Sequence, residues 1–395
     1  MMFRSFNSHV FQIRNNYVVV LQNLQNPSLL RFISQISEPN HVPQSEATTA
    51  VDFLINSCGL SMEKANSVVK KINHPNFKTQ NPNSVLDYLK SIGFSKTHIA
   101  KLISTYPALL FSSVERTLKP KLHLFKERGF SDALIADLMV FRPTVFFRGL
   151  KSQIIPSLEC IKSFVQTDEN VVRVVKRSFY MLTNSPGSRF QPNVCILREC
   201  NVPDSRIAHL IMSQPNILQL KAVALKEAID KVKELGFQPE MRMFTVALHA
   251  VCSMSKSTWD RKVKLLKEWG WSDEQIVYGF KKAPLFMACS EKKMNLVLDY
   301  FLKTLKWDAS VLSENPICLS YSLKMRVMPR VKVYKILMEN KVPITEKELL
   351  NMFFMTEERF LKNVVVKYKD FLPDFYKSCK GDVEKGRLGT KISID

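Results

Sequence analysis

The chain has 395 residues, with 57 Lys or Arg against 36 Asp or Glu, so its formal net charge is +21. A charge this large does not indicate a fold, but it favours a polyanionic partner: nucleic acid first, an anionic membrane surface second. A basic surface that served only solubility would need less charge. The 11 glycines form neither GxGxxG nor GxxxxGK(S/T), which argues against the common nucleotide-binding enzymes.

The eight cysteines and seven histidines show no ligand or catalytic spacing. No CxxC pair and no HExxH sequence is present. We therefore expect free thiols, no metal, no cofactor and no enzymatic activity. No apolar run approaches the length of about 18 residues that suggests a membrane-spanning helix.

The N-terminal segment has the composition of a targeting peptide. Three arginines and no acidic residue precede Glu38, and the other residues include many Phe, Ser, Asn and Val. Segments that contain arginine and serine and lack acidic residues are typical of organellar transit peptides. We expect residues 1–40 to be a transit peptide, for the mitochondrion first and the chloroplast as the alternative. Residues 41–50 are expected to be a linker.

Proline recurs through the chain with a period of 36 residues, from Pro107 to Pro143 and from Pro120 to Pro156. Apolar residues keep the same phase. They are Ile99, Leu102 and Ile103, then Ile135, Leu138 and Met139, then Val171, Val174 and Val175, then Ile207, Leu210 and Ile211. Self-similarity at this period indicates a solenoid of stacked repeats.

Each repeat is predicted to contain two helices. Apolar residues at i, i+3, i+4 and i+7 over 99–106 predict a first helix, which Ser95 caps and Pro107 ends. A second helix follows, with Pro120 in its first turn and Gly129 after its last residue. The pattern therefore predicts an all-α fold.

The later repeats are less regular. The period shortens after residue 225, and capping boxes are predicted at 272–275 and 345–348. We expect the array to cover residues 51–375 in about eight or nine units. A polar tail is expected at 376–395.

The segment from Leu89 to Leu124 combines a Gly-Phe-Ser turn, a Pro-x-Leu-Leu element and a Leu-x-Pro-Lys element. In this combination it resembles the mitochondrial transcription termination factor (mTERF) family. Segments 125–161, 199–235 and 269–302 are similar to further repeats of that family, and 255–263 is similar to its plant members. The resemblance covers about residues 50–370.

Four positions depart from the family's pattern. Phe179 and Val251 occupy places where proline is usual, and Val165 and Asn201 occupy places where glycine is usual. These departures affect the boundaries of the repeats.

The resemblance implies a right-handed superhelical solenoid with a concave basic groove that binds organellar nucleic acid. We expect a factor that binds double-stranded DNA as a monomer and regulates transcription by termination or initiation. The alternative is an RNA-binding factor for intron splicing or rRNA maturation. A protein scaffold of the tetratricopeptide kind is disfavoured by the charge of +21.

The nucleic-acid contacts are expected on the second helix of each repeat and on the loop before it, where basic side chains can follow a phosphate backbone. The expected contacts are Arg116, Lys119, Lys121, Arg148, Lys151, Lys221, Arg261, Lys262, Lys264, Lys292, Lys293, Arg326 and Arg330. Phe146 and Phe147 are the candidates for stacking on a base.

Overall fold

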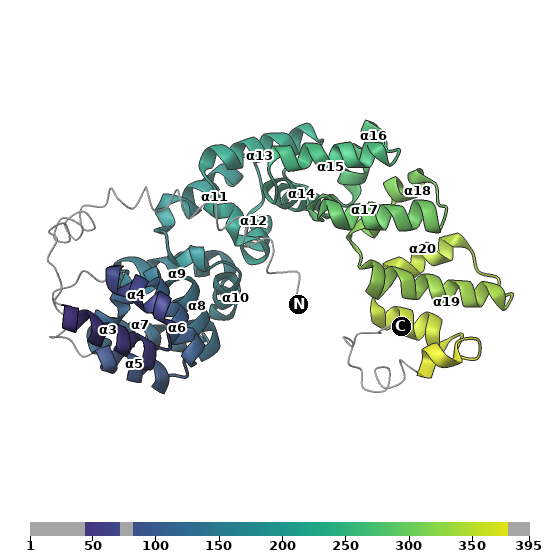
Figure 1. The fold of residues 1–395 in the computed structure, drawn as a ribbon. Coiled ribbons are helices and arrows are strands. Elements are labelled where there is room, and N and C mark those ends of the chain that lie inside the picture. The colour runs from purple at the N-terminus through teal and green to yellow at the C-terminus, as the bar shows by residue number, and fades with distance from the viewer. Residues whose placement is uncertain (1–43, 72–81, 378–395) are drawn as a thin grey trace. The chain divides into compact units, whose positions relative to one another are not determined.

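The computed structural model describes residues 44–71 and 82–377 (Figure 1). The expected transit peptide and nearly all of the expected tail lie outside these residues. The described residues form helices and no strand, so the predicted all-α fold is confirmed. The chain divides into two compact units, Met1–Pro186 and Gly187–Asp395.

The first unit contains eight described α-helices: a single helix, then three helix pairs, then the first helix of the next repeat. Its helices are α3 (Gln44–Asn56), α4 (Met62–Lys71), α5 (Pro82–Ser91), α6 (Lys96–Thr105), α7 (Lys119–Glu127), α8 (Asp132–Phe141), α9 (Ile155–Val165) and α10 (Asp168–Arg177). The expected linker at 41–50 is corrected here, because α3 begins at Gln44 and residues 44–50 are helical. Residues 41–43 lie outside the described residues.

The second unit continues the same alternation of helices. Its helices are α11 (Phe190–Glu199), α12 (Asp204–Ser213), α13 (Ala222–Glu234), α14 (Arg242–Cys252), α15 (Lys256–Glu268), α16 (Asp273–Lys282), α17 (Glu291–Asp299), α18 (Ala309–Glu314), α19 (Met328–Glu339), α20 (Glu346–Phe354) and α21 (Glu357–Phe360). First helices pack on first helices, as α12 on α14 and α14 on α16, and second helices pack on second helices, as α15 on α17 (Figure 1). Two layers of helices therefore stack within this unit.

The periodic apolar residues form the core. All twelve residues of the in-phase set between 99 and 211 are at most 2% exposed. Removal of this much apolar surface from water is the main contribution to folding. The 36-residue period therefore marks the buried side of successive first helices.

Hydroxyl side chains start the helices where the sequence predicts them. Ser95 accepts a hydrogen bond from the N–H of His98, and Ser131 accepts one from the N–H of Leu134. The capping boxes at 272–275 and 345–348 are both present. These bonds satisfy N–H groups that a helix leaves unpaired at its start.

Proline ends the first helices and also starts a 3-10 turn, which the sequence analysis did not anticipate. These turns are Pro107–Phe111 (η2), Pro143–Phe147 (η4), Pro215–Gln219 (η8), Pro284–Ala288 (η9) and Pro316–Ser320 (η11). The turn also forms at Phe179, which replaces proline. Val251 does not end its helix, because it can donate the N–H that proline lacks, and α14 continues to Cys252.

Three second helices begin with a π-helical turn ahead of a proline. These turns are Val114–Leu118 (η3), Leu150–Ile154 (η5) and Leu323–Val327 (η12). In the first of them the N–H of Leu118 donates to the carbonyl of Ser113 at 3.3 Å, and Pro120 follows two residues later. Proline has no N–H to continue the α-helical ladder backwards, so the wider i→i+5 bonds occur just before it.

Candidate nucleic-acid interface

Each repeat has two ends, because its two helices run in opposite directions. We call the end that carries the turns around residues 93, 129, 201, 236 and 270 the glycine edge. We call the other end the proline edge. It carries the 3-10 turns and the loops after them, at 107–113, 143–149, 215–221, 284–290 and 316–322, the loop between α14 and α15 at 253–255, and the starts of the second helices that follow these loops. The charges at these two edges are arranged differently.

Ion pairs recur along the glycine edge. In each, a cation in the last turn of a second helix meets an aspartate in the first turn of the next first helix. The pairs are Lys126 with Asp132, Lys162 with Asp168, Arg198 with Asp204 and Lys267 with Asp273, each at 2.8 Å. Both charges also suit the helix dipoles beside them. The positive charge of this edge is therefore largely compensated.

At the proline edge acidic residues compensate only part of the positive charge, as in the pairs of Lys119 with Glu115 and of Arg261 with Glu291. The second helices that begin with η5, α11, α13, α15 and η12 have no acidic residue in their first turns, whereas η3 contains Glu115 and α17 contains Glu291. Exposed lysines occupy the starts of several second helices: Lys151, Lys221, Lys256 and Lys324. A cation at a helix N-terminus is unfavourable for the helix itself, whereas an anion there is favourable. The proline edge therefore has the electrostatic character of a phosphate-binding surface.

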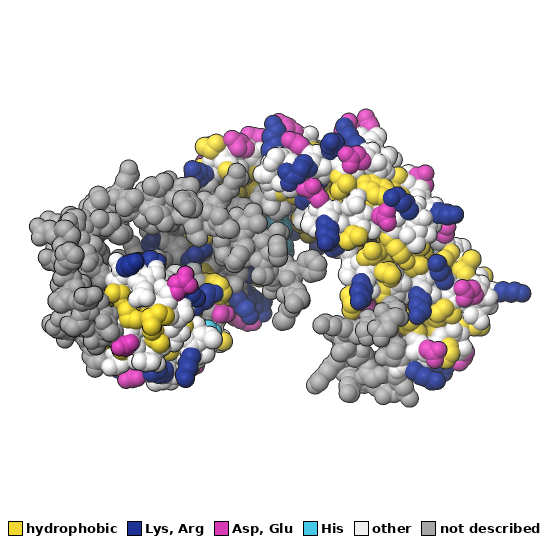
Figure 2. Space-filling view, viewed as in Figure 1, with side chains coloured by type: hydrophobic (Ala, Val, Ile, Leu, Met, Phe, Trp, Pro, Cys, Tyr) yellow, Lys and Arg dark blue, Asp and Glu magenta, His cyan; other side chains and the backbone are white. Residues whose placement is uncertain are grey.

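The exposed face of the second unit drawn in Figure 2 has a different character. Over α13, α15 and α16, Lys and Arg side chains alternate with Asp and Glu side chains. A surface of mixed sign attracts a polyanion only weakly. The net charge of the chain is thus distributed unevenly among its faces.

The sequence-predicted contacts fall into three classes by exposure. Exposed are Arg116, Lys119, Lys151, Lys221, Arg261, Lys264 and Lys292; half-buried are Arg148, Lys293 and Arg326; buried are Lys121, Lys262 and Arg330. Three of the exposed residues pair with acids: Lys119 with Glu115, Arg261 with Glu291 and Lys264 with Glu268. Those pairs reduce the charge that each residue offers to a ligand.

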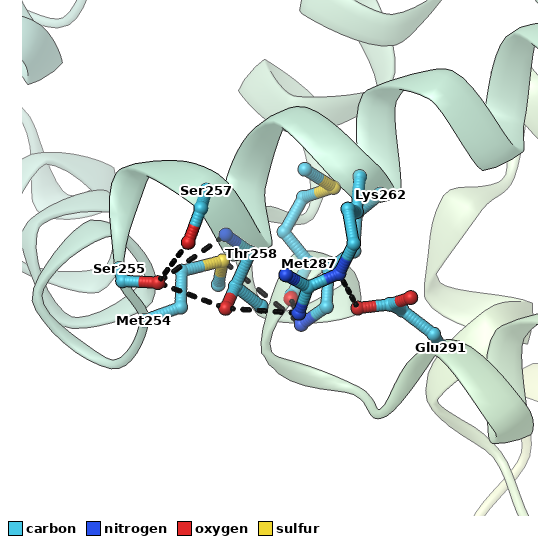
Figure 3. A network of polar contacts seen from close by, with 8 residues as sticks. Met254, Ser255, Ser257, Thr258, Lys262, Met287 and Glu291 are labelled. Carbon is cyan, nitrogen blue, oxygen red and sulfur yellow. Dashed lines mark hydrogen bonds and ion pairs between the residues drawn. The ribbon is translucent and has the colours of Figure 1, made fainter.

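The three buried residues are a correction to the predicted set. Lys121 donates to the carbonyl oxygen of Phe146, and Lys262 donates to that of Met287 at 2.7 Å (Figure 3). Arg330 donates to the carbonyl of Met352 at 2.8 Å. A cation held inside the protein by backbone carbonyls does not reach a phosphate. We therefore remove these three residues from the candidate interface.

Burial has the expected effect on the titration of these cations. It lowers the pKa of Lys121 to about 8 and also lowers the pKa of Lys262, because the charged ammonium loses hydration. The carbonyls that accept their hydrogen bonds replace part of that hydration.

Half-buried basic residues make similar contacts. The Nζ atom of Lys293 donates to the carbonyl of Ser320 at 2.5 Å. Arg326 donates to the carbonyls of Phe353 and Met355 at 3.0 and 2.7 Å. These residues bind the loop of the following repeat, and only part of each side chain is available to a ligand.

The structure also adds two residues that the sequence analysis missed. Both are exposed lysines at the proline edge. Lys256 directly follows the N-cap Ser255, and Lys324 lies two residues after the N-cap Ser322. A lysine within two residues of a serine N-cap of a second helix was a usable sequence signal.

The two aromatic candidates have different environments. Phe146 is fully buried and packs against Phe125, with ring centroids 6.0 Å apart, so it is not a stacking platform. Phe147 is 41% exposed at the proline edge and contacts the ring of Tyr106 at 5.0 Å. Of the two rings, that of Phe147 alone is open to a ligand.

Residues 44–71 and 82–377 contain no group of His, Cys, Asp and Glu that could hold a metal ion. In the same part of the chain, no helix has the length and apolar composition needed to span a bilayer.

These features define a helical-repeat protein whose repeats have an ion-paired end and a more basic end. The mTERF family model matches residues 86–247 and 243–361, which is more than half of the chain. The protein belongs to the mTERF family.

A curated plant protein is similar over much of this region. The chain is 22% identical over 274 residues to "Transcription termination factor MTERF8, chloroplastic" of Arabidopsis thaliana. The alignment covers 69% of this chain and 54% of that protein. The chain therefore spans about half the length of this relative.

Proposed function

We propose that the protein binds double-stranded DNA of an organelle along its proline edge and regulates transcription there, by termination or initiation. The observation that carries the proposal is the contrast between the two edges. Acids compensate the basic residues at the glycine edge, whereas Lys151, Lys221, Lys256 and Lys324 stand at helix starts whose first turns contain no acid.

The repetition of these lysines suits a phosphate backbone. Four helix starts, those of η5, α13, α15 and η12, present an exposed lysine, and a nucleic acid presents negative charge at regular intervals. Contacts of this kind determine affinity and orientation, and they carry little sequence information. A basic groove that follows the backbone is the proposed form of the complex, with one protein molecule per site.

Family membership and the related protein support the biological part of the proposal. The relative's name describes a transcription termination factor of the chloroplast. The acid-free N-terminal segment with three arginines agrees with import into an organelle, either mitochondrion or chloroplast. Imaging of the full chain fused at its C-terminus to a fluorescent protein distinguishes the two organelles, and a cytosolic signal would contradict the proposal.

The binding partner is tested with the full chain in a salt series. Fluorescence anisotropy is measured with a mixed-sequence duplex DNA, a single-stranded RNA and a hairpin RNA of equal length. We expect the duplex to bind most tightly, with log Kd rising steeply with log salt concentration. Tighter binding to either RNA would favour a role in intron splicing or rRNA maturation. Absence of binding to all three nucleic acids would overturn the proposal.

A further inference from the structure

A set of side chains on second helices binds the backbone of the following repeat at one recurrent place. Asn193 on α11 donates to the carbonyls of Leu218 and Leu220, at 3.0 and 2.9 Å. Arg189, which precedes α11, donates to the carbonyl of Gln219 at 2.9 Å. Three consecutive carbonyls at the end of the 3-10 turn η8 are thus held from one helix.

The same contact occurs in other repeats with a different donor. Lys121 binds the carbonyl of the fourth residue of the 3-10 turn η4, and Lys262 binds the fourth residue of η9 (Figure 3). Leu218 is likewise the fourth residue of η8. We call Lys121, Asn193 and Lys262 the clasp residues.

The clasp does not require a charge. Asn193 is neutral and only 1% exposed, yet it makes two of these hydrogen bonds. The shared property of the three clasp residues is therefore a buried N–H donor that reaches a backbone carbonyl of the next repeat. Such carbonyls would otherwise be buried without a partner.

The clasped segment leads directly to residues of the proline edge. Leu220, whose carbonyl Asn193 holds, precedes Lys221, the N-cap residue of α13. The segment held by Lys262 leads to Ser290, the N-cap residue of α17, and then to the exposed Lys292. The clasps thus fix the backbone from which the exposed lysines project.

We propose that the clasp residues are positioning residues for nucleic-acid binding: each holds the next repeat's loop so that its exposed lysine meets a phosphate, while the clasp residue itself touches no phosphate. This inference rests on the proposed function. It assigns the lysine of the Leu-x-Pro-Lys element to the contact between repeats.

The test uses Asn193 because its replacement changes no charge. In Asn193→Leu, the carbonyls of Leu218 and Leu220 lose their donor, and we expect Lys221 to lose its phosphate contact. The log–log salt slope of duplex binding should then fall by about 0.9, and affinity at 0.1 M salt by about eightfold, the effect of one phosphate contact. Lys221→Gln should give the same loss.

The double variant Asn193→Leu/Lys221→Gln separates positioning from a general structural effect. If Asn193 acts through Lys221, the double variant binds no more weakly than Lys221→Gln alone. Losses that add, or an Asn193→Leu slope equal to that of the wild type, would overturn the inference. Circular dichroism and thermal melting establish that each variant is folded.

Lys262 provides an independent test if Asn193→Leu does not fold. Lys262→Met removes the donor, and its partner variant is Lys292→Gln. Hydrogen exchange of the amides at 288–293 should accelerate in Lys262→Met without nucleic acid present. Unchanged exchange would show that Lys262 does not hold this loop, and would overturn the inference. A wild type that binds neither DNA nor RNA would overturn the proposed function, but it would not alter the interpretation of the exchange result.

Discussion

The Nζ atom of Lys262 lies 2.7 Å from the carbonyl oxygen of Met287, which is 25 residues further along the chain. This one hydrogen bond joins a second helix to the 3-10 turn of the next repeat. It also shows that a basic residue in a basic protein need not face its ligand. A buried lysine that donates to a backbone carbonyl joins two repeats, whereas an exposed lysine at a helix start without acidic neighbours is available to nucleic acid.

The buried Lys121 should make stability depend on pH in the alkaline range. Its pKa is lowered to about 8 in the folded protein, against 10.5 ordinarily. Between these values the unfolded state binds more protons, so the free energy of unfolding should rise with pH. Lys121→Met should lose the part of this rise that Lys121 contributes. Urea unfolding at pH 7, 8, 9 and 10 measures it, and parallel pH profiles for the two proteins would contradict the burial of a titrating ammonium.

The ion pairs of Asp168 at the glycine edge should contribute little to the free energy of unfolding, and this contribution should be lost when the carboxylate is protonated at acid pH. Lys162 and Arg128 contact its carboxylate at 2.8 and 3.1 Å and lower its pKa below 3.8, the hydrogen bond from Lys162 most of all. Asp168→Asn should lower the free energy of unfolding at pH 7 by less than about 1 kcal/mol, because the carboxylate is partly exposed.

The pH dependence of that variant provides the check. A lowered pKa gives stability that is present above 3.8 and is lost as pH falls through the folded-state pKa. The difference between wild type and Asp168→Asn should therefore shrink at acid pH. A difference that persists unchanged at pH 2 would show that the amide acts through packing.

Gly129 should be required for its backbone conformation alone. Its φ angle is +82°, and a Cβ atom placed there would meet no heavy atom within 4 Å. Gly129→Ala should cost about 1–2 kcal/mol of unfolding free energy, the cost of a left-handed conformation with a side chain. Gly187→Ala is the control, because Gly187 has no positive φ angle. Equal stabilities of the two variants would contradict this explanation.

Local features of the fold could be predicted from the sequence. Apolar spacing at 99–106, the caps Ser95 and Ser131 and the helix-ending Pro107 act over a few residues, and each occurs as predicted. Asn201 is a further local feature. Its φ angle is +61°, a conformation that asparagine adopts more readily than most residues, so it can replace the glycine that is usual there.

The clasps could not be predicted in the same way. The partner of Lys121 is a backbone carbonyl 25 residues away, and no residue type marks a carbonyl. A lysine beside Pro120 has the same local sequence whether it faces solvent or the next repeat. The 3-10 turns begin at the helix-ending prolines. Which carbonyl of a turn meets the preceding repeat depends on how the helices stack, and local patterns do not specify that.

The proposal places nucleic-acid binding at the proline edge and not on the whole basic surface. Two variants that each remove three charges distinguish these possibilities. Lys151→Gln/Lys221→Gln/Lys324→Gln alters the proline edge, and Lys126→Gln/Lys162→Gln/Lys267→Gln alters the glycine edge. Duplex DNA binding by the full chain is measured across a salt series for both. The log–log salt slope should fall by about 2.7 in the first variant, at about 0.9 per phosphate contact, and stay at the wild-type value in the second. Equal slopes in the two variants would show that the proline edge contributes no more to binding than the glycine edge does.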